Sequence, residues 1–354
     1  MKIYFFIRIL FVIVILGING CGQHPKSNPN KTYANDFALS PDGKVIVFSL
    51  SKGNRTSDLA SYEISSGTVR TFKLTGDDFY KEPVFSPSGR EIVFVAGKRL
   101  KGSNIYIQNL ETGKIRRLTN TESTYPEREG IYYSNSFPNF SPDGKKIIFC
   151  RSAIVFKRAN GGLMQTDWDL FEVDILTGAE RKLTNHKFFT ITRPYYLPSG
   201  KQFAFSATIL NNKSGVGPKS FREYDQLYKD NIIFIMDEKN RGIKPAFVRG
   251  DSSRNPSVSG NGDIVFISKT NDLDGGTTYT HDLFIHNKTS STRLTTRRFS
   301  YELNVPFISF NGSRVLFQAD NRETGKPGWT VWIINRDGTG LKDINFMELL
   351  NKES

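Results

Sequence analysis

A single turn signature recurs six times along the chain, and it restricts the possible folds more than any other feature. In each copy a Gly preceded by Asp, Ser or Asn closes a tight turn, and a short apolar run ending in Phe follows. The turn glycines lie 46, 55, 56, 62 and 50 residues apart and are Gly43, Gly89, Gly144, Gly200, Gly262 and Gly312. The runs end at Phe48, Phe94, Phe149, Phe205, Phe266 and Phe317. A repeat of this length is typical of propeller blades and of repeat arrays.

The chemistry of the repeat predicts strands joined by hairpins. Pro fixes φ, Asp hydrogen-bonds its own backbone and Gly accepts positive φ, so Ser-Pro-Asp-Gly joins two strands by a tight turn. A second pair of strands follows in each copy, at residues 58–75, 104–119, 169–184, 231–248, 282–295 and 330–344. Aromatic residues make up 13% of the chain, which also favours strands. Four antiparallel strands in each of six copies predict an all-β, six-bladed β-propeller.

The repeat resembles that of a known family. The segment FSPDGKKIIF at Phe140, followed by DLFEVDILTGAERKLT at Asp169, is similar to the WD40-like Pro-Asp repeat of the TolB family. The resemblance covers about Asn35 to Ile344 and implies a TolB-like β-propeller, a fold that serves many functions. TolB itself carries an α/β domain before its propeller. Here only a short tether separates Cys21 from the first blade, so partners of that domain are not carried over.

The first residues have the pattern of an export signal. Lys2 and Arg8 precede the apolar run Ile9–Ile18, as in a secretory signal peptide, and the segment up to Cys21 resembles a bacterial lipobox. The alternative is an ordinary signal peptide cut nearby, which would leave Cys21 as a free thiol. We expect a signal peptide at 1–20, a lipidated Cys21 with a flexible tether at 21–33, the propeller at 34–345 and a tail at 346–354. Gly22 does not resemble the Asp that marks inner-membrane retention, so we expect an outer-membrane anchor facing the periplasm.

A ring of residues beside the central axis is the first candidate site. Five copies place Pro six residues before the turn Gly, and Phe37 takes that place in the first copy. The residue before it should enter the sheet at the axis, which predicts a ring of Asp36, Glu82, Phe137, Arg193, Asn255 and Val305. With polar residues one step earlier, the expected binding residues of this channel mouth are Asp36, Glu82, Arg193, Arg254, Asn255 and Asn304. Guanidinium forks suit an anionic or hydroxyl-rich group, although the mouth of any propeller channel is wet.

Long insertions form the second candidate site. Residues 120–136, 151–167, 207–230 and 269–281 should be loops on the face opposite the short turns, over the third to fifth blades. They carry aromatic and Arg side chains of the kind that interfaces use, and the expected rim residues are Tyr132, Tyr133, Arg158, Trp168, Arg222 and Tyr224. The alternative is that these side chains pack the loops onto the blades.

Familiar catalytic and metal signatures are missing from the sequence. There are four histidines, and no HExxH, GxSxG, P-loop or dinucleotide fingerprint is present. Asp272 and Asp274 lie in a stretch that lacks the spacing of a calcium loop. We therefore expect no catalytic residue, no metal and no cofactor. Cys150, within a strand, should be a small buried hydrophobe.

The net charge of +13 raises the question of an anionic partner. Many of the cations lie on or beside the predicted outermost strands, where they guard sheet edges and form no nucleic-acid stripe. We therefore expect a monomeric, non-enzymatic envelope lipoprotein that binds a protein partner or a cell-wall polymer and does not bind nucleic acid. The alternative is an exported enzyme or sensor that acts on acidic oligosaccharides at the channel mouth.

Overall fold

The structure is a computed structural model. It describes residues 33–51, 56–72, 74, 76–98, 101–121, 131–156, 163–208, 231–239, 242–246, 253–270, 280–295, 303–320 and 329–344. Several residues singled out above lie outside these ranges, namely Cys21, Arg158, Arg222, Tyr224, Asp272 and Asp274. The signal segment and the tail at 346–354 also lie outside them. Within the described ranges, no helix has the length and apolar character needed to cross a membrane.

The described strands form six antiparallel sheets of four consecutive strands each. The innermost strands are β1 (Tyr33–Leu39), β5 (Phe79–Phe85), β9 (Ile131–Phe140), β13 (Thr190–Tyr196), β17 (Arg254–Val258) and β21 (Leu303–Ile308). The second strands are β2 (Val45–Ser51), β6 (Glu91–Gly97), β10 (Lys146–Phe156), β14 (Gln202–Thr208), β18 (Ile264–Thr270) and β22 (Arg314–Asp320).

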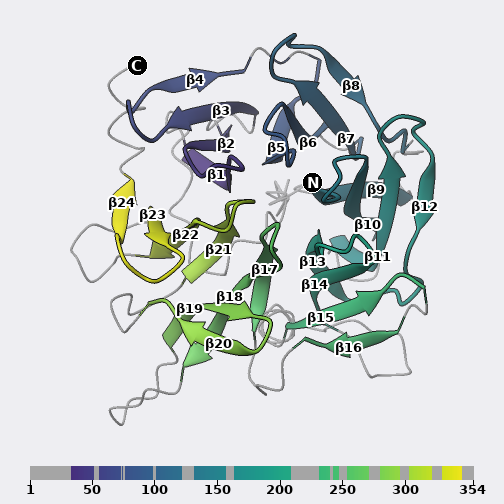
Figure 1. The fold of residues 1–354 in the computed structure, drawn as a ribbon. Coiled ribbons are helices and arrows are strands. Elements are labelled where there is room, and N and C mark those ends of the chain that lie inside the picture. Colours follow the sequence, from purple (N-terminus) through teal and green to yellow (C-terminus); the bar gives the residue numbers. More distant parts are fainter. Residues whose placement is uncertain are drawn as a thin grey trace, which may run out of the picture.

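The outer half of each sheet completes the blade. The third strands are β3 (Ser57–Glu63), β7 (Ser103–Asn109), β11 (Leu163–Asp174), β15 (Ile232–Asp237), β19 (Thr280–Asn287) and β23 (Trp329–Asn335). The outermost strands are β4 (Val69–Thr71), β8 (Ile115–Arg117), β12 (Glu180–Lys182), β16 (Ile243–Pro245), β20 (Ser290–Arg293) and β24 (Lys342–Ile344). The sheets are arranged radially about one axis (Figure 1), which confirms the predicted six-bladed propeller.

The repeated turn has the geometry that its sequence predicts. All six turn glycines have positive φ, between 67° and 93°. In the first blade Ser40 Oγ accepts hydrogen bonds from the backbone N–H groups of Lys44 (3.1 Å) and Val45 (2.9 Å) and donates one to Asp42 (2.6 Å). That bond from Ser40 lowers the pKa of Asp42. Each turn is therefore held by its own side chains before any packing is considered.

The repeated Phe residues form the core of the blades. All six are at most 2% exposed, and several stack on an aromatic ring of the third strand, such as Phe149 on Phe171 at 5.8 Å. Cys150, next to Phe149, is fully buried and its pKa is raised well above the usual value by burial. This confirms that Cys150 is a buried hydrophobe.

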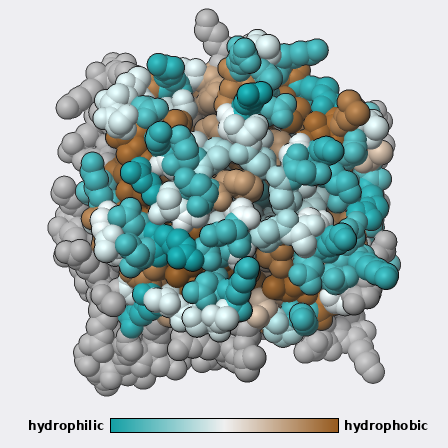
Figure 2. Space-filling view, viewed as in Figure 1, coloured by the Kyte–Doolittle hydropathy of each residue, from teal (hydrophilic) through white to brown (hydrophobic). Residues whose placement is uncertain are grey.

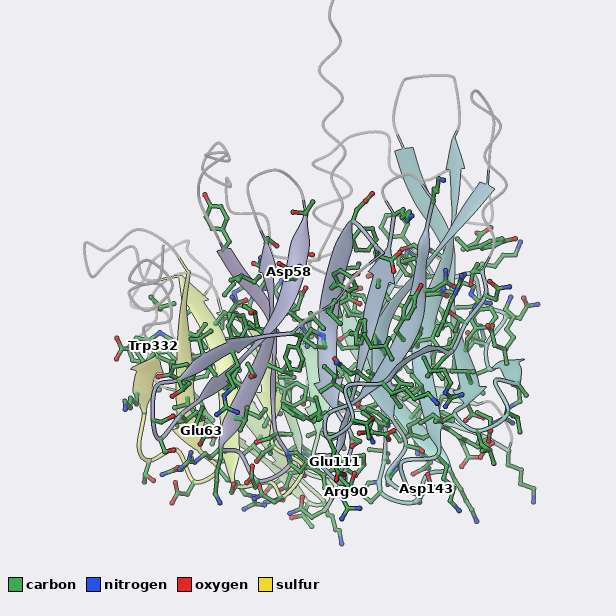
Figure 3. The ribbon with its side chains drawn as sticks, turned by 90° about the horizontal axis from the view of Figure 1, so that it is seen from above. Asp58, Glu63, Arg90, Glu111, Asp143 and Trp332 are labelled. Carbon is green, nitrogen blue, oxygen red and sulfur yellow. The ribbon has the colours of Figure 1, made fainter. Side chains whose placement is uncertain are left out.

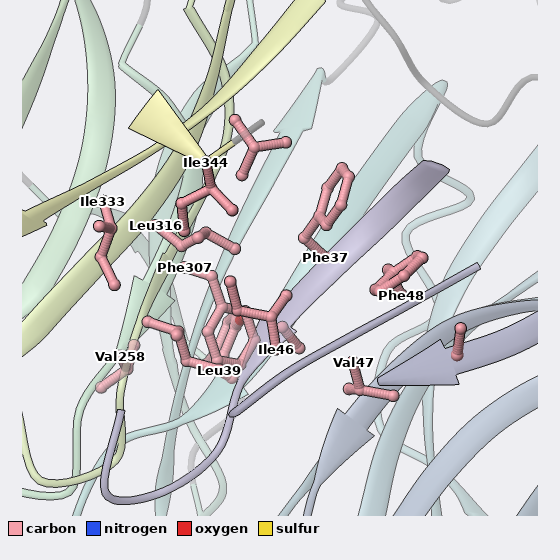
Figure 4. Close-up of a cluster of buried hydrophobic side chains, with 14 of the residues drawn as sticks. Phe37, Leu39, Ile46, Val47, Phe48, Val258, Phe307, Leu316, Ile333 and Ile344 are labelled. Atoms are coloured by element: carbon pink, nitrogen blue, oxygen red, sulfur yellow. The ribbon is translucent and has the colours of Figure 1, made fainter. Parts of the chain in front are cut away.

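The first and last blades meet without sharing a strand in the described sheets. Apolar side chains from both, including Phe37, Leu39 and Phe307, pack into one cluster at this seam (Figure 4). Two hydrogen bonds to backbone carbonyls also cross it, from Asn311 N to Pro41 O (3.0 Å) and from Arg314 Nη1 to Gly43 O (3.1 Å). Side-chain packing and turn contacts therefore close the ring.

Two of the outer-strand cations pair with a buried Asp of the neighbouring strand, which the sequence analysis missed. In the third blade the buried Asp169, within β11, accepts a hydrogen bond from Thr184 (2.7 Å) and forms an ion pair with Lys182 (2.9 Å). Asp282, Thr295 and Arg293 repeat this clamp in the fifth blade, and Arg117 binds the carbonyl of Thr119 in the second. The sequence marks this arrangement in three blades. An Asp or Asn on the third strand is followed, at the end of the fourth strand, by Arg-Leu-Thr or Lys-Leu-Thr.

Two predicted loops are shorter than expected. The range 151–167 is mostly strand, because β10 continues to Phe156 and β11 begins at Leu163, with these two residues paired. The range 120–136 likewise ends in β9, which begins at Ile131. The apolar residues Ile154, Val155 and Phe156 continue the strand pattern. The polar residues that follow them led to the prediction of a loop over the whole range.

Candidate functional site

The two faces of the disc differ in construction. The short turns between the first and second strands and between the third and fourth strands share one face, here called the turn face. Figure 3 shows Arg90, Asp143, Glu63 and Glu111 at this side, with Asp58 toward the opposite side. On that opposite side, the loop face, β9, β10 and β11 extend beyond the other strands. Both the start of β1 and the end of β24 lie on the loop face, because the four strands of a blade alternate in direction.

The predicted ring forms a repeated bulge. Asp36, Glu82, Phe137, Arg193, Asn255 and Val305 all have φ between 50° and 55°, in the left-handed region. The pairing between first and second strands shifts at this point in every blade. A left-handed non-glycine residue costs about 1–2 kcal/mol. Six such residues at one register show that the surrounding fold holds this geometry.

Four ring residues line a hollow of about 30 Å³ on the axis, here called the mouth hollow: Asp36, Glu82, Phe137 and Arg193. Asp36 Oδ2 accepts a hydrogen bond from Ser49 Oγ (3.0 Å) and one from the backbone N–H of Glu82 (3.4 Å). Glu82 Oε2 in turn accepts one from the backbone N–H of Phe137 (2.5 Å). The two carboxylates therefore connect the bulges of three consecutive blades.

Glu82 is a buried carboxyl group, 7% exposed. Burial raises its pKa, and the nearby Asp36 adds to this effect. The ammonium group of Lys81, 3.1 Å from Glu82 Oε1, and the hydrogen bond from Phe137 act in the opposite direction without cancelling it. Glu82 therefore serves the ring mainly as an internal hydrogen-bond acceptor.

Arg193 differs from the other charged groups of the ring. Its side chain is half-buried at the mouth hollow, and it forms no hydrogen bond or ion pair within the described part of the chain. A guanidinium group in such a place retains its five donors for a ligand. It is the group of the mouth hollow best placed to bind an anionic partner group.

The remaining predicted mouth residues are less accessible. Arg254 and Asn255 are 3% and 4% exposed, and the backbone N–H of Asn255 donates to Ser206 Oγ (2.9 Å). Arg254 is thus buried in the fifth blade, because it stands one residue before the bulge and not in it. Asn304 lies in β21, and its side chain is outside the described part. The structure therefore brings Asp36, Glu82 and Arg193 together, and leaves Arg254 and Asn255 buried and outside the lining of the mouth hollow.

The predicted rim residues that are described lie on strands. Tyr132 and Tyr133 belong to β9, and Tyr133 is 39% exposed. Trp168 belongs to β11 and is 6% exposed, packed in a cluster with Leu170 and Phe188. Trp168 therefore stabilises the junction of the third and fourth blades and does not present its ring to a partner.

The described residues hold no group of three or more His, Cys, Asp or Glu side chains arranged to bind a metal ion. What the mouth hollow offers chemically is recognition, with one accessible guanidinium group beside two carboxylates that serve as internal acceptors. The residue set that the sequence analysis overlooked is the apolar end of the channel at the turn face. Its signal was the repeated turn Pro together with an aromatic residue, Phe310, within a turn.

Comparisons with known proteins give relatives of two kinds. Residues 40–154 match the family described as the dipeptidyl peptidase IV (DPP IV) N-terminal region. The uncharacterized peptidase YuxL of Bacillus subtilis is 25% identical over 57% of this chain and 32% of its own length. The Tol-Pal system protein TolB of Francisella tularensis subsp. holarctica is 24% identical over 56% of this chain and 51% of its own length. The chain thus spans about half or less of these curated relatives.

A solved structure shows the same fold. TolB from Acinetobacter baumannii superposes with a TM-score of 0.56 at 19% identity, covering 88% of this chain and 63% of the other. Six radial four-stranded blades place the molecule in the class of six-bladed β-propellers. More particularly, the chain is a TolB-like β-propeller, as the resemblance of its repeats implies.

The expectation that the chain is not an enzyme is corrected by these relatives. A peptidase and a family model named for a peptidase match it as well as TolB does. The expectation depended on missing catalytic motifs, and the chain spans only part of the length of relatives of either kind. The relatives are therefore mixed in kind.

Proposed function

We propose that this propeller is an exported, lipid-anchored scaffold of the cell envelope that binds another protein through its loop face. The mouth hollow with Arg193 lies at the centre of that face, and the projecting β9, β10 and β11 stand at its edge with Tyr133 exposed. The match to a Tol-Pal system protein supports a protein partner in the envelope. Binding through the propeller is compatible with both kinds of relative, TolB and peptidase.

The observation that carries the proposal is the guanidinium group of Arg193, which has no hydrogen-bond or ion-pair partner among the described residues. Half-buried at the mouth hollow, this cation keeps its hydrogen-bond donors for a partner group. Its backbone is also held in a strained conformation that positions the side chain at the axis. A carboxylate of a partner would satisfy this group with paired hydrogen bonds.

The test compares charge reversal at Arg193 with charge reversal elsewhere. The full-length wild type, Arg193→Glu and Arg70→Glu are each used to capture proteins from detergent-solubilised envelopes, and each captured partner is then titrated with purified protein. Arg70 is the matched control because it is an exposed Arg on β4, the outermost strand of the first blade. We expect Arg193→Glu to weaken the partner at least about tenfold, consistent with the loss of a charge-assisted contact, and Arg70→Glu to leave it unchanged.

Two results would overturn the proposal. One is a partner that binds Arg193→Glu as well as it binds the wild type. The other is binding heat with uronic-acid oligomers that disappears in Arg193→Glu, which would assign the mouth to acidic oligosaccharides.

A further inference from the structure

The channel has a second, chemically different opening at the turn face. A hollow of about 50 Å³, here called the turn-face hollow, is lined by Pro41, Pro87, Pro142, Pro198 and Phe310 among other apolar side chains. Tyr195 and Phe307, whose rings meet edge to face at 6.4 Å, line both this hollow and the mouth hollow. Val84 and Asn139 also line both, so the two hollows adjoin along the channel, one with charged and one with apolar walls.

The wall of the turn-face hollow is a ring of turns packed on one another. A side chain added at Gly89 would lie 3.5 Å from Pro41, and one at Gly262 would lie 3.2 Å from Pro198. Gly260 N donates a hydrogen bond to Phe310 O (2.7 Å), which joins the fifth blade to the sixth. The hollow is therefore a preformed feature of the fold, as binding sites for apolar groups commonly are.

The charges around this hollow are uneven. The residue after the turn Gly is an exposed cation in each of the first four blades, and the last three of these cations are Arg90, Lys145 and Lys201. None of the three forms an ion pair within the described part of the chain, whereas Lys44 pairs with Asp42 and Arg336 with Asp263 in other blades. Asp143, the acidic group nearest in sequence to Lys145, is bound by Ser141 of its own turn (2.6 Å). One side of the hollow is thus cationic, and Phe310, 36% exposed, stands on the other.

We propose that the turn face is a second docking surface, which takes an acidic segment of a partner protein with one apolar side chain inserted in the turn-face hollow. The volume admits the tip of a single apolar side chain, since one water needs about 10–15 Å³. Arg90, Lys145 and Lys201, which form no ion pair with a described residue, complement acidic residues next to that side chain. Figure 2 views this face: hydrophilic side chains cover much of it, and paler and brown residues interrupt them near the centre.

This surface is independent of the proposed loop-face site. The chain leaves the propeller on the loop face at both β1 and β24, so the turn face points away from any tether that continues from Tyr33. A partner that rests on the turn face would not compete with a partner on the loop face, because the two faces lie on opposite sides of the disc.

The test uses fluorescent heptapeptides and the full-length protein. The main probe carries one Phe with two acidic residues on each side; a second probe replaces Phe by Ser, and a third replaces the acidic residues by Lys. Fluorescence anisotropy should show binding of the main probe and at least tenfold weaker binding of the other two. Charge reversal at Arg90, Lys145 and Lys201 together (each →Glu) should weaken the main probe at least tenfold.

A matched control triple separates local recognition from general attraction. Lys114→Glu, Lys239→Glu and Lys288→Glu change the charge equally on exposed residues of the outer turns of the same face, farther from the axis. This triple and Arg193→Glu should leave the main probe unaffected, while Phe310→Ser should weaken it. The proposal fails if the wild type does not bind the main probe, if both triples weaken binding equally, or if the Lys probe binds as well.

Discussion

At the scale of single residues, two buried glutamates show how position decides the behaviour of one side-chain type. Burial raises the pKa of Glu82 in the mouth hollow above its usual 4.5, and Lys81 offsets this only in part. Burial also favours the neutral form of Glu172, but hydrogen bonds from Tyr196 (2.7 Å) and Lys146 (3.0 Å) and the charge of Arg181 outweigh it and lower its pKa. The first carboxyl group connects bulges, and the second belongs to an ion-pair network.

The two glutamates should therefore affect stability with opposite pH dependence. A raised folded pKa means that the contribution of Glu82 is complete below pH 4.5 and is lost as the pH rises through the folded pKa. Relative to the wild type, Glu82→Gln should gain free energy of unfolding as the pH rises from 4.5, by at most about 1.4 kcal/mol per pH unit because one proton is involved. Urea unfolding at several values between pH 3.5 and 7.5 measures this.

Glu172→Gln provides the opposite case. Because the pKa of Glu172 is lowered in the folded state, its carboxylate contributes stability that is present above pH 4.5 and is lost as the pH falls. The loss of unfolding free energy caused by Glu172→Gln should therefore become smaller in acid. Parallel pH profiles of the two variants would show that the burial of Glu82 has no electrostatic cost.

At the scale of elements, the bulge in each innermost strand is the device that builds the site. It brings one residue from each of the first four blades to the mouth hollow, whereas Arg254, which precedes the bulge of the fifth blade, is buried. Five of the six bulge residues precede Pro, and Pro restricts the backbone of the residue before it. The strained backbone is stabilised by hydrogen bonds between the bulge and the neighbouring blade, as from Glu82 N to Asp36 and from Phe137 N to Glu82.

The strain at the bulge is measurable at Val305, a β-branched residue with φ 52°. We compare Val305→Gly with Val315→Gly, because Val315 is buried in β22 of the same blade, paired with Ile308. Glycine removes the left-handed penalty only at position 305, so Val305→Gly should be less destabilising by about 1–2 kcal/mol. Chemical denaturation gives both values, and equal losses would show that the bulge is unstrained.

At the scale of the whole molecule, each described blade consists of four consecutive strands, and packing closes the ring. The seam between the first and last blades is made by the Phe37, Leu39 and Phe307 cluster with two hydrogen bonds. No particular blade therefore has to be first along the chain, since each sheet is complete without a strand from elsewhere in the sequence.

A circular permutant tests this. The chain from 33 to 344 is opened between Ala246 and Ser253, after β16 and before β17, and its original ends are joined by a flexible Gly/Ser linker. All six sheets stay whole, so we expect native circular dichroism and an unfolding midpoint within about 5 °C of the unpermuted chain, a shift of one or two kcal/mol. A second permutant, opened at Gly144, divides the inner hairpin of the third blade, and its unfolding midpoint should be lowered much further. Equal losses in both would contradict the independence of the sheets.

The number of blades, the turns and the register of the axial ring could all be predicted from the amino-acid sequence. These depend on short-range physics, because Pro and Gly set backbone angles locally and the spacing of the repeat counts the sheets. The positions of Asp36, Glu82 and Arg193 around one hollow followed from that register.

Only the tertiary structure decided which side chains are accessible and which are paired. Among the described residues Arg193 has no partner at the mouth hollow, while Arg254 is buried. Trp168 fills a blade junction, and Lys182 pairs inward with Asp169. The turn-face hollow likewise appears only when four turn prolines meet across the ring. Burial and pairing depend on neighbours many residues away in the chain, and the local pattern of a strand carries no information about them.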